Sequence, residues 1–432
     1  MHLLPINADL DIVVDLMRNL SLQSDPQQAA SLYGRGLARL NIVPNDRYLS
    51  ISRRDLLAPK YRITRNTGWT NHPNPWKEKE KLPVLSGGIL SDILYSNKPA
   101  IITDLQSKIS KDDPAFEALK DMELLVGLPH FDHGEAINVG VLLNRSAENF
   151  PFKDVPMMVW QANLWGRATL NLVNTQKLQA AYDTMDRELK VVADIQRSLL
   201  PPVLPEIRGV AMATHYQTSQ RAGGDYYDFF PLPGGLWGIL LADVSGHGTP
   251  AAVLMAITHA IAHTHPGHPM PPDQLLSFVN GHLARMYTQN NGNFVTAIYG
   301  IYSPGGGDGK SGGTLLYASA GHPPPRMVRG GKIVEVEGDT SFPLGIHAGE
   351  RFISHTVELQ RGDRLLFYTD GITEAFDREG ELFGEARLDE VCVRHATATP
   401  EKIVRGVLEA LEDFSKGAAV TDDRTLLVMG VG

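Results

Sequence analysis

The chain contains the stretch Ala242-Asp243-Val244-Ser245-Gly246-His247-Gly248, and this stretch predicts how the second half folds. The apolar run 237–241 comes directly before it and predicts a buried strand that ends at Asp243. The two glycines permit a tight reversal of the backbone. Thr249-Pro250 follows with a hydroxyl cap and a proline at the first helical position, which predicts the start of a helix. The stretch therefore places one carboxylate where a core strand opens into a turn.

Aspartates recur at the ends of other predicted core strands. Asp225 follows a pair of glycines, Asp370 follows the run 365–369, and Asp422-Asp423 precede the run 425–429. Carboxylates from several strand ends suit a hard divalent cation. Two such cations, about 3.5–4 Å apart, support hydrolysis of a phosphomonoester. An all-oxygen ligand set favours Mn²⁺ or Mg²⁺, whereas zinc would be expected with histidine or cysteine ligands.

The composition is that of a globular protein with more than one domain. The 432 residues are 43% hydrophobic and 21% charged, which suits two domains and a connector. The formal net charge of −9 argues against a nucleic-acid partner. Cys392 is the single cysteine, so no intrachain disulfide forms and a reducing compartment is favoured. We see no signal peptide and no apolar run of about 20 residues, and we therefore predict a cytoplasmic protein without a membrane span.

Residues 1–156 have a mixed α+β pattern, with helices predicted over 9–20 and 26–40 and short strands after them. The segments 97–104, 128–129 and 134–142 make this region resemble a GAF domain, over about residues 20–165. The resemblance implies a sensor domain for an unknown small-molecule or protein signal. The alternative is an unrelated α+β domain that serves only as a dimer surface.

Residues 157–200 contain no proline and predict a continuous helical linker, which ends at Pro201-Pro202. Large side chains alternate at spacings of four and three, the pattern of a coiled-coil seam. The seam consists of Leu178, Tyr182, Met185, Leu189, Val192, Gln196 and Leu199. We expect a parallel homodimer helix that transmits a signal between two domains. The alternative is an ordinary amphipathic helix packed on its own domain.

Residues 201–432 predict many short strands, with helices near 250–263, 272–287 and 400–414. A hairpin is expected from two runs, 297–302 and 314–318, joined by the glycine-rich turn 304–313. The turn includes Gly309-Lys310-Ser311, but it is not a phosphate loop. Proline stands at position 304, where the first glycine is required, and no helix follows.

Six motifs of this second region occur in the order and spacing of one known family. They are Gly223-Gly224-Asp225-Tyr226-Tyr227-Asp228, Asp243-Val244-Ser245-Gly246-His247-Gly248, Ala320-Gly321-His322-Pro323-Pro324, Pro343-Leu344-Gly345, Tyr368-Thr369-Asp370-Gly371 and Asp422-Asp423-Arg424-Thr425. The region thereby resembles the SpoIIE-type branch of the metal-dependent PPM protein phosphatases, over about residues 195–432. The resemblance implies an α/β/β/α sandwich of two antiparallel sheets. It also implies serine/threonine phosphatase activity, in many members toward a phosphorylated anti-sigma-factor antagonist.

The same resemblance implies roles for individual residues. Asp243 would bridge two metal ions, Mn²⁺ or Mg²⁺. Asp225 and the backbone carbonyl of Val244 would bind the second ion, and Asp370 and Asp422 would complete the first. Asp243 and Asp225 are thus the expected catalytic residues, which hold the ions that activate water for direct attack on phosphorus. Asp423 is left open as an alternative to Asp422, because adjacent residues point in different directions from a strand end.

Other polar residues near these motifs have less certain roles. Arg221 lies four residues before Asp225, the spacing of a phosphate-binding arginine in related phosphatases outside this branch. His247 and His322 are candidates for the general acid or for contact with substrate, against a structural role bonded to backbone. Water on the metal is an alternative source of the proton. Asp228 is either a ligand or a structural acceptor.

Three other classes of protein compete with a phosphatase. A catalytically silent scaffold of the same fold would be expected to have lost part of the carboxylate set, which is complete here. A diguanylate cyclase continues Glu-Phe after Gly-Gly-Asp, whereas this chain continues Tyr226-Tyr227. A sensor histidine kinase needs a phosphoacceptor histidine, and segment 157–199 has none. We therefore predict an α+β protein with a GAF-like sensor, a helical linker and a PPM-type phosphatase domain at 201–432.

Overall fold

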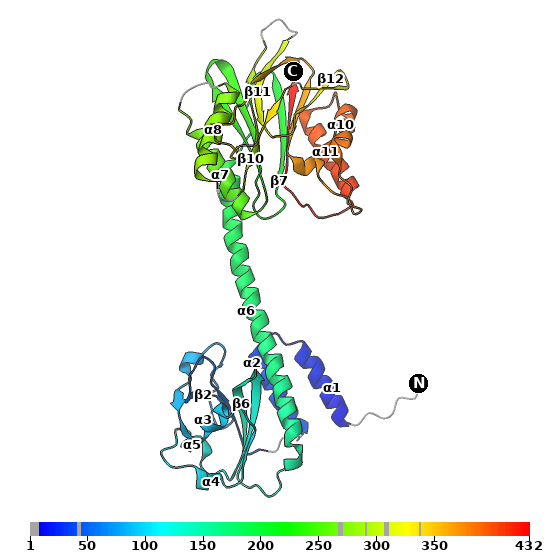
Figure 1. Ribbon diagram of the computed structural model, residues 1–432. Coiled ribbons are helices and arrows are strands. Elements are labelled where there is room, and N and C mark those ends of the chain that lie inside the picture. Colours follow the sequence, from blue (N-terminus) through cyan, green and yellow to red (C-terminus); the bar gives the residue numbers. More distant parts are fainter. Residues whose placement is uncertain (1–7, 41–44, 267–270, 290–291, 306–310, 337) are drawn as a thin grey trace, which may run out of the picture. The chain divides into compact units, whose positions relative to one another are not determined.

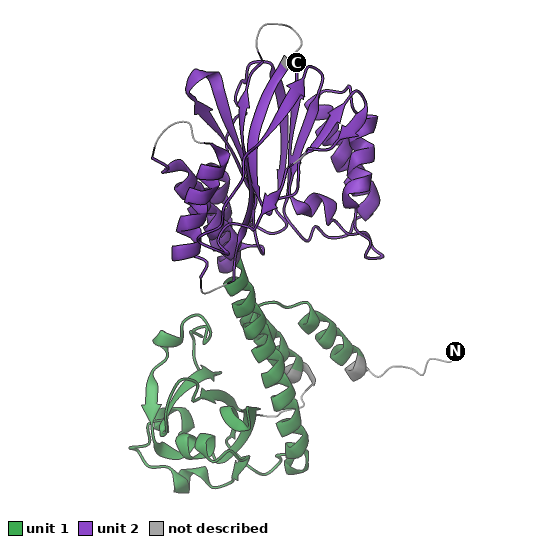
Figure 2. Cartoon of the chain, turned by 45° about the horizontal axis from the view of Figure 1, so that its top comes forward, with its two compact units in different colours: residues 1–183 green, residues 184–432 purple. Residues whose placement is uncertain are grey.

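A computed structural model describes residues 8–40, 45–266, 271–289, 292–305, 311–336 and 338–432. The chain forms two compact units, residues 1–183 and 184–432 (Figure 2). One long helix, α6 (Val155–Leu199), begins in the first unit and ends in the second. Each unit is therefore described by itself.

The N-terminal unit is built on one six-stranded sheet. Every neighbouring pair of strands is antiparallel, in the order β3-β2-β1-β6-β5-β4. Its strands are β1 (Arg47–Ser52), β2 (Lys60–Asn66), β3 (Val84–Ser86), β4 (Ala100–Ile102), β5 (Leu124–Asp132) and β6 (Glu135–Asn144). Its helices before α6 are α1 (Ala8–Ser21), α2 (Pro26–Leu40), α3 (Gly88–Tyr95), α4 (Leu105–Lys108) and α5 (Phe116–Leu119).

The two faces of this sheet differ in chemistry, because successive side chains of a strand point to opposite sides. One face is apolar: Leu49, Ile63 and Val141 are buried there together with Leu90 and Leu119 of the short helices. On the other face, β1 and β2 place mostly polar residues, whereas β5 and β6 place Val126, Leu128 and Leu142 there in a smaller apolar cluster. Only one face of the sheet therefore carries the main hydrophobic core.

Asn163 of α6 hydrogen-bonds to the sheet on the face opposite the main core, where Val155 and Met158 of the same helix also pack. Asn163 accepts a hydrogen bond from the backbone N–H of Phe131 (2.9 Å) and donates to the carbonyl of Pro129 (2.8 Å). Both partners lie on β5. Because the side-chain amide satisfies backbone groups of a strand, it fixes the position of the helix along that strand.

The C-terminal unit is a sandwich of two sheets with helices on both outer faces (Figure 1). The first sheet has the order β14-β11-β10-β9-β8, with β15 also paired to β11, and the second has the order β13-β12-β16-β17-β7. Its strands are β7 (Val210–Gln217), β8 (Tyr226–Leu232), β9 (Leu236–Val244), β10 (Val295–Ser303), β11 (Ser311–Ala320), β12 (Arg326–Arg329), β13 (Lys332–Val334), β14 (Thr340–Ser341), β15 (His355–Gln360), β16 (Arg364–Tyr368) and β17 (Arg424–Val431). Its helices are α7 (Thr249–His263), α8 (Pro272–Met286), α9 (Asp370–Thr373), α10 (Gly384–Arg394) and α11 (Pro400–Ser415).

Strand β16 shows why the sandwich has two cores. Leu365 and Phe367 lie in the core between the sheets, whereas Leu366 and Tyr368 lie in a second core under α10 and α11. Because alternate residues face opposite sides, a strand covered on both faces must be apolar throughout. The run 365–368 meets this requirement, as does most of β17.

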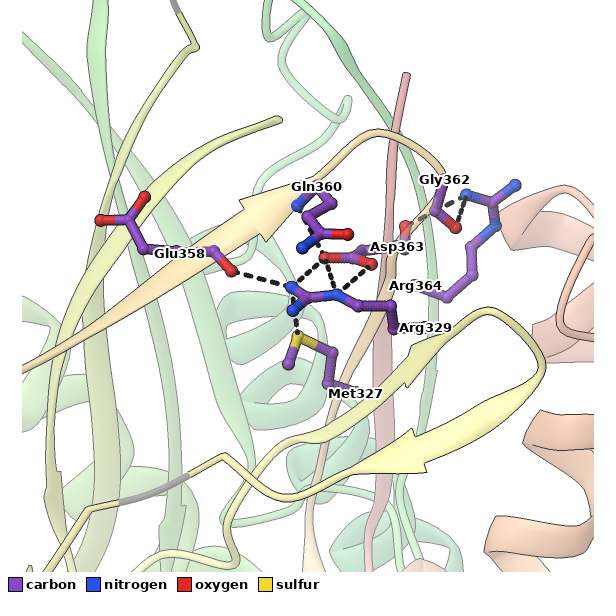
Figure 3. A network of polar contacts seen from close by, with 7 residues as sticks. All are labelled: Met327, Arg329, Glu358, Gln360, Gly362, Asp363 and Arg364. Atoms are coloured by element: carbon purple, nitrogen blue, oxygen red, sulfur yellow. Dashed lines mark hydrogen bonds and ion pairs between the residues drawn. The ribbon is translucent and has the colours of Figure 1, made fainter. Parts of the chain in front are cut away.

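A buried ion pair reinforces the turn between β15 and β16, which belong to different sheets. Asp363 accepts hydrogen bonds from Arg329 Nη2 (2.7 Å), from Arg329 Nε and from the backbone N–H of Gln360 (Figure 3). The same guanidinium donates to the carbonyl of Glu358 (2.8 Å). The Asp363 side chain is 1% exposed, so its charge depends on these donors.

The fold agrees with the α+β sandwich predicted from the sequence. The predicted helices correspond to α7, α8 and α11, and the predicted hairpin corresponds to β10 and β11. The turn expected over 304–313 lies in part outside the described residues. Among the helices that the structure describes, none is long and apolar enough to cross a lipid bilayer.

Candidate active site

The four predicted carboxylate ligands come from the ends of four strands, two in each sheet. Asp225 directly precedes β8 and Asp243 is the penultimate residue of β9, and these two strands are neighbours in the first sheet. Asp370 lies two residues after β16 and Asp422 two residues before β17, and these strands are neighbours in the second. The sandwich therefore directs all four carboxylates to one edge.

Glycine permits the loops at this edge to approach one another closely. A Cβ atom on Gly224 would lie 2.8 Å from the carbonyl oxygen of Val244. A Cβ atom on Gly371 would overlap the carbonyl oxygen of Asp423. Any larger residue at either position would push the carboxylate-bearing segments apart.

The carboxylate of Asp225 is held by two threonines. Its Oδ2 atom accepts hydrogen bonds from Thr369 Oγ1 (2.8 Å) and from Thr425 Oγ1. Its Oδ1 atom is buried and has no donor in the structure. The carboxylate of Asp243 is its neighbour, and two acceptors cannot satisfy each other without a proton or a cation between them. This buried oxygen without a hydrogen-bond donor is therefore a suitable ligand for a bound cation.

The electrostatics of the cluster also fit a cation. Burial, and after it the charges of Asp225, Asp370 and Asp422, raise the pKa of Asp243 to about 10. Burial likewise raises the pKa of Asp225 and of Asp370. Carboxylates that are both buried and close together resist ionisation until a positive charge compensates them. A bound cation would supply that compensation.

Asp422 and Asp423 have different surroundings. Asp423 is 2% exposed, and its carboxylate accepts hydrogen bonds from the backbone N–H groups of Ser219 and Gly224. Asp422 is half-buried, and its charge contributes to the raised pKa of Asp243. Asp423 therefore fastens the Gly224 loop, whereas Asp422 faces the other carboxylates. This arrangement favours Asp422 as the ligand.

The predicted substrate-binding residues lie at different distances from the cluster. Burial raises the pKa of Asp422, and His247 lies close enough to oppose this rise in part; its Nδ1 atom is 2.8 Å from Gln220 Nε2. Arg221 instead forms an ion pair with Asp186 of α6, at 2.7 Å. In this arrangement its guanidinium is engaged by the helix.

His322 is a buried neutral residue. Its Nδ1 atom lies 2.9 Å from Thr296 Oγ1, and Thr296 is the β10 residue paired with Asp243. Burial lowers the pKa of His322 to about 3. A histidine that stays neutral at physiological pH supports the strand next to the cluster but does not supply a proton readily.

Sequence reasoning missed the residue that links α6 to this edge. Gln196 is 4% exposed; its Nε2 atom donates to the carbonyl of Gly223 (2.6 Å), and its Oε1 atom accepts from the backbone N–H of the same glycine (3.0 Å). The seam pattern included Gln196 but gave no sign of this contact. The end of α6 thus holds the loop that carries Asp225.

A second candidate site is a cavity of about 1,320 Å³ in the N-terminal unit. It is lined by the polar face of the sheet and by residues of α2 and α6, including Tyr33 and Trp165, whose rings stack at 4.2 Å. His130 is half-buried in its wall, and desolvation lowers its pKa to about 4. The basic residues of the lining outnumber the acidic ones. They are Arg35, Arg54, Arg62, Arg65, Lys79, Arg167 and Lys177, against Asp46, Asp55 and Asp132.

Comparison with known proteins shows a family similarity in the C-terminal unit. Residues 233–432 match the family model described as Stage II sporulation protein E (SpoIIE). The match falls in the region whose six motifs predict a SpoIIE-type phosphatase domain.

The individual relatives have low sequence identity to this chain. "Protein IcfG" of Synechocystis sp. is 25% identical over 289 residues, which are 60% of this chain and 44% of the relative. "Phosphoserine phosphatase RsbU" of Bacillus subtilis is 25% identical over 261 residues, 59% of this chain and 73% of the relative. The match thus spans less than half of the first of these proteins. The solved "SiaA-PP2C domain of Pseudomonas aeruginosa" is 20% identical with a TM-score of 0.49, covering 59% of this chain and 98% of that one.

Proposed function

We propose that this protein is a metal-dependent serine/threonine phosphatase that removes phosphate from a partner regulatory protein. The observation that carries the proposal is the buried, donorless Oδ1 atom of Asp225 beside the carboxylate of Asp243, in a domain of the SpoIIE type. An arrangement of this kind is costly to bury unless a cation occupies it.

The ligand set proposed for the two ions is Asp243 as the bridge, Asp225 with the carbonyl of Val244 on one side, and Asp370 with Asp422 on the other. All are oxygen ligands, which suits Mn²⁺ or Mg²⁺. When bound, such ions activate water for attack on phosphorus and neutralise the phosphate oxygens. The contribution of the protein itself is to hold these ligand atoms in position.

Three residues of the chain fix the ligand geometry. Thr369 and Thr425 orient the Asp225 carboxylate, which leaves one oxygen free to bind. Asp423 holds the Gly224 loop against the second sheet. Second-sphere contacts of this kind keep ligands in a productive orientation and tune their affinity for the metal.

The proposed substrate is a phosphoserine or phosphothreonine on a small regulatory protein of the anti-sigma-factor antagonist type. Two relatives carry the name phosphoserine phosphatase, RsbU and RsbP of Bacillus subtilis. The remainder of the proposal rests on the family resemblance of residues 201–432.

We further propose that residues 1–156 form a GAF-like sensor that controls the phosphatase through α6. The cavity and its excess of basic residues support a small anionic ligand as the signal. Gln196 and Asp186 of α6 contact Gly223 and Arg221, so a movement of this helix would reach the loop before Asp225. A parallel dimer through the exposed members of the α6 seam, Leu178, Tyr182 and Met185, belongs to the same proposal.

The proposal is tested on the full chain with para-nitrophenyl phosphate and a phosphoserine peptide, with Mn²⁺ or with EDTA. Activity should require Mn²⁺ and should fall at least 100-fold in Asp243→Asn, whereas exposed Asp413→Asn on α11 is the matched control. Normal activity in Asp243→Asn, or activity unaffected by EDTA, would refute the assignment. An inactive wild-type chain with intact circular dichroism would favour a silent scaffold.

The role of α6 is tested separately by Gln196→Ala, with exposed Gln179→Ala on the same helix as control. We expect Gln196→Ala to raise the Mn²⁺ concentration needed for half-maximal activity, because the Asp225 loop loses both bonds to the helix. An unchanged Mn²⁺ dependence would show that the helix does not position this loop.

A further inference from the structure

One cluster of potential metal ligands lies away from the carboxylate edge. Asp228 of β8 faces two histidines of α7, His259 and His263. The Oδ2 atom of Asp228 is 2.7 Å from His263 Nε2 and 3.7 Å from His259 Nδ1. One donor atom from each of the three residues lies within 4.8 Å of the other two.

The secondary structure brings these side chains together. Residues four apart on a helix lie on the same face, so His259 and His263 both point toward the same strand, with ring centroids 4.3 Å apart. Along β8, Asp228 and Tyr226 share one face because side chains alternate. The last turn of α7 therefore closes over Asp228.

We propose that Asp228, His259 and His263 form a binding site for a divalent transition-metal ion, separate from the phosphatase centre, with zinc as the best-suited ion. Two imidazoles and one carboxylate are a common zinc donor set, with water in the fourth position. The carboxylate edge offers oxygen ligands, whereas this site adds nitrogen. The two sites thus select different ions.

The surroundings of the cluster support metal binding. The side chains of Asp228 and His259 are 10% and 22% exposed, and His263 is 44% exposed and gives solvent access. The Tyr226 hydroxyl bonds to Asp228 Oδ2 and lies 2.9 Å from His259 Nδ1, so a metal ion bound through these two atoms would displace it. Burial and the neighbouring His263 lower the pKa of His259, which favours the neutral imidazole that binds metals.

The position of the site suggests what occupancy would do. Asp228 lies three residues after Asp225 on β8, and α7 begins five residues after Val244, the last residue of β9. A metal ion would tie the end of α7 to β8. We expect this cross-link to stabilise the C-terminal unit, because a ligand that binds only the folded state raises its stability.

The test uses the full chain carrying Asp243→Asn, stripped with EDTA, transferred to EDTA-free buffer and then given millimolar Mg²⁺ to fill remaining oxygen sites. Zn²⁺ binding is measured by equilibrium dialysis, and Co²⁺ is used as a spectroscopic probe of nitrogen ligation. We expect one Zn²⁺ per chain, at least tenfold weaker binding in His263→Gln, and a zinc-dependent rise in melting temperature. His265→Gln, outside the cluster, should bind as the parent does.

The outcomes separate this inference from the phosphatase proposal, because the parent already lacks the proposed bridging ligand. Folding of each variant is checked by circular dichroism. His263→Gln changes the most exposed member, so it should fold, and His259→Gln provides a second variant. Zinc binding that is absent, or that is equal in the parent and both variants, would overturn the proposal and leave Asp228, His259 and His263 as a hydrogen-bonded network.

Discussion

Without bound cations, the carboxylate edge should make the C-terminal unit less stable at neutral pH than in mild acid. The pKa of Asp243 in the folded chain is raised to about 10, against 3.8 in the unfolded chain. A raised pKa of this kind contributes stability that is fully present below about pH 4 and is lost as the pH rises toward the folded value.

The size of the effect follows from the same values. Between pH 3.8 and pH 7 the unfolded chain releases a proton that folded Asp243 retains. At 1.36 kcal/mol per pH unit, folding loses about 4 kcal/mol over this range. Asp243→Asn removes this loss, and its amide can also donate to the orphaned Oδ1 atom of Asp225. The variant should therefore be more stable than the wild type in EDTA, although we expect it to be inactive.

The assay is thermal unfolding of the full chain in EDTA at pH 5, 6, 7 and 8. At pH 7, Asp243→Asn should melt on the order of 10 °C above the wild type, at about 2–4 °C per kcal/mol for a domain of this size. The N-terminal unit is identical in both proteins, so the difference reports on the C-terminal unit. In saturating Mn²⁺, the wild type should instead melt above Asp243→Asn. The reasoning would be refuted if the melting temperatures of wild type and Asp243→Asn changed equally with pH in EDTA. It would also be refuted if the variant melted below the wild type in EDTA.

Three further changes have defined expectations. Arg329→Gln should destabilise the C-terminal unit by about 3–5 kcal/mol, because Asp363 stays buried without its cation; urea unfolding measures this, and a loss below 1 kcal/mol would contradict it. Thr425→Val removes one donor to Asp225 and should cost about 1–3 kcal/mol and weaken Mn²⁺ binding; equal Mn²⁺ titrations would count against the proposed orienting role. Asn163→Ala should speed amide exchange along β5, since its bonds to Phe131 and Pro129 are lost, and unchanged exchange would show that α6 does not support this strand.

The parts of the fold that were predictable from sequence depend on local patterns. The run 365–368 predicts a strand because its residues are apolar throughout, and Thr249-Pro250 predicts the start of α7 by its capping chemistry. Helix α10 was not among the predicted elements. The sandwich itself came from the family motifs, since no local pattern specifies how two sheets stack.

The sequence predicted the candidate ligand carboxylates, but it did not predict the residues that hold them in place. The spacing of aspartates at strand ends indicated the carboxylate edge. The preference for Asp422 over Asp423 required the structure, because only hydrogen bonds to Ser219 and Gly224 distinguish two adjacent aspartates. The contact of Gln196 with Gly223 joins residues 27 positions apart, and no sequence period encodes such a pair. The metal-ligand roles of all these residues remain predictions for the experiments above.

The one-sided core of the N-terminal unit has a consequence for how such a domain diverges. The residues that hold the sheet to its short helices, such as Leu49 and Val141, lie on one face, and the cavity lining lies on the other. Substitutions in the lining therefore leave the main core intact. Under the sensor proposal, descendants of this chain could therefore exchange one ligand for another at little cost in folding, while α6 stays unchanged.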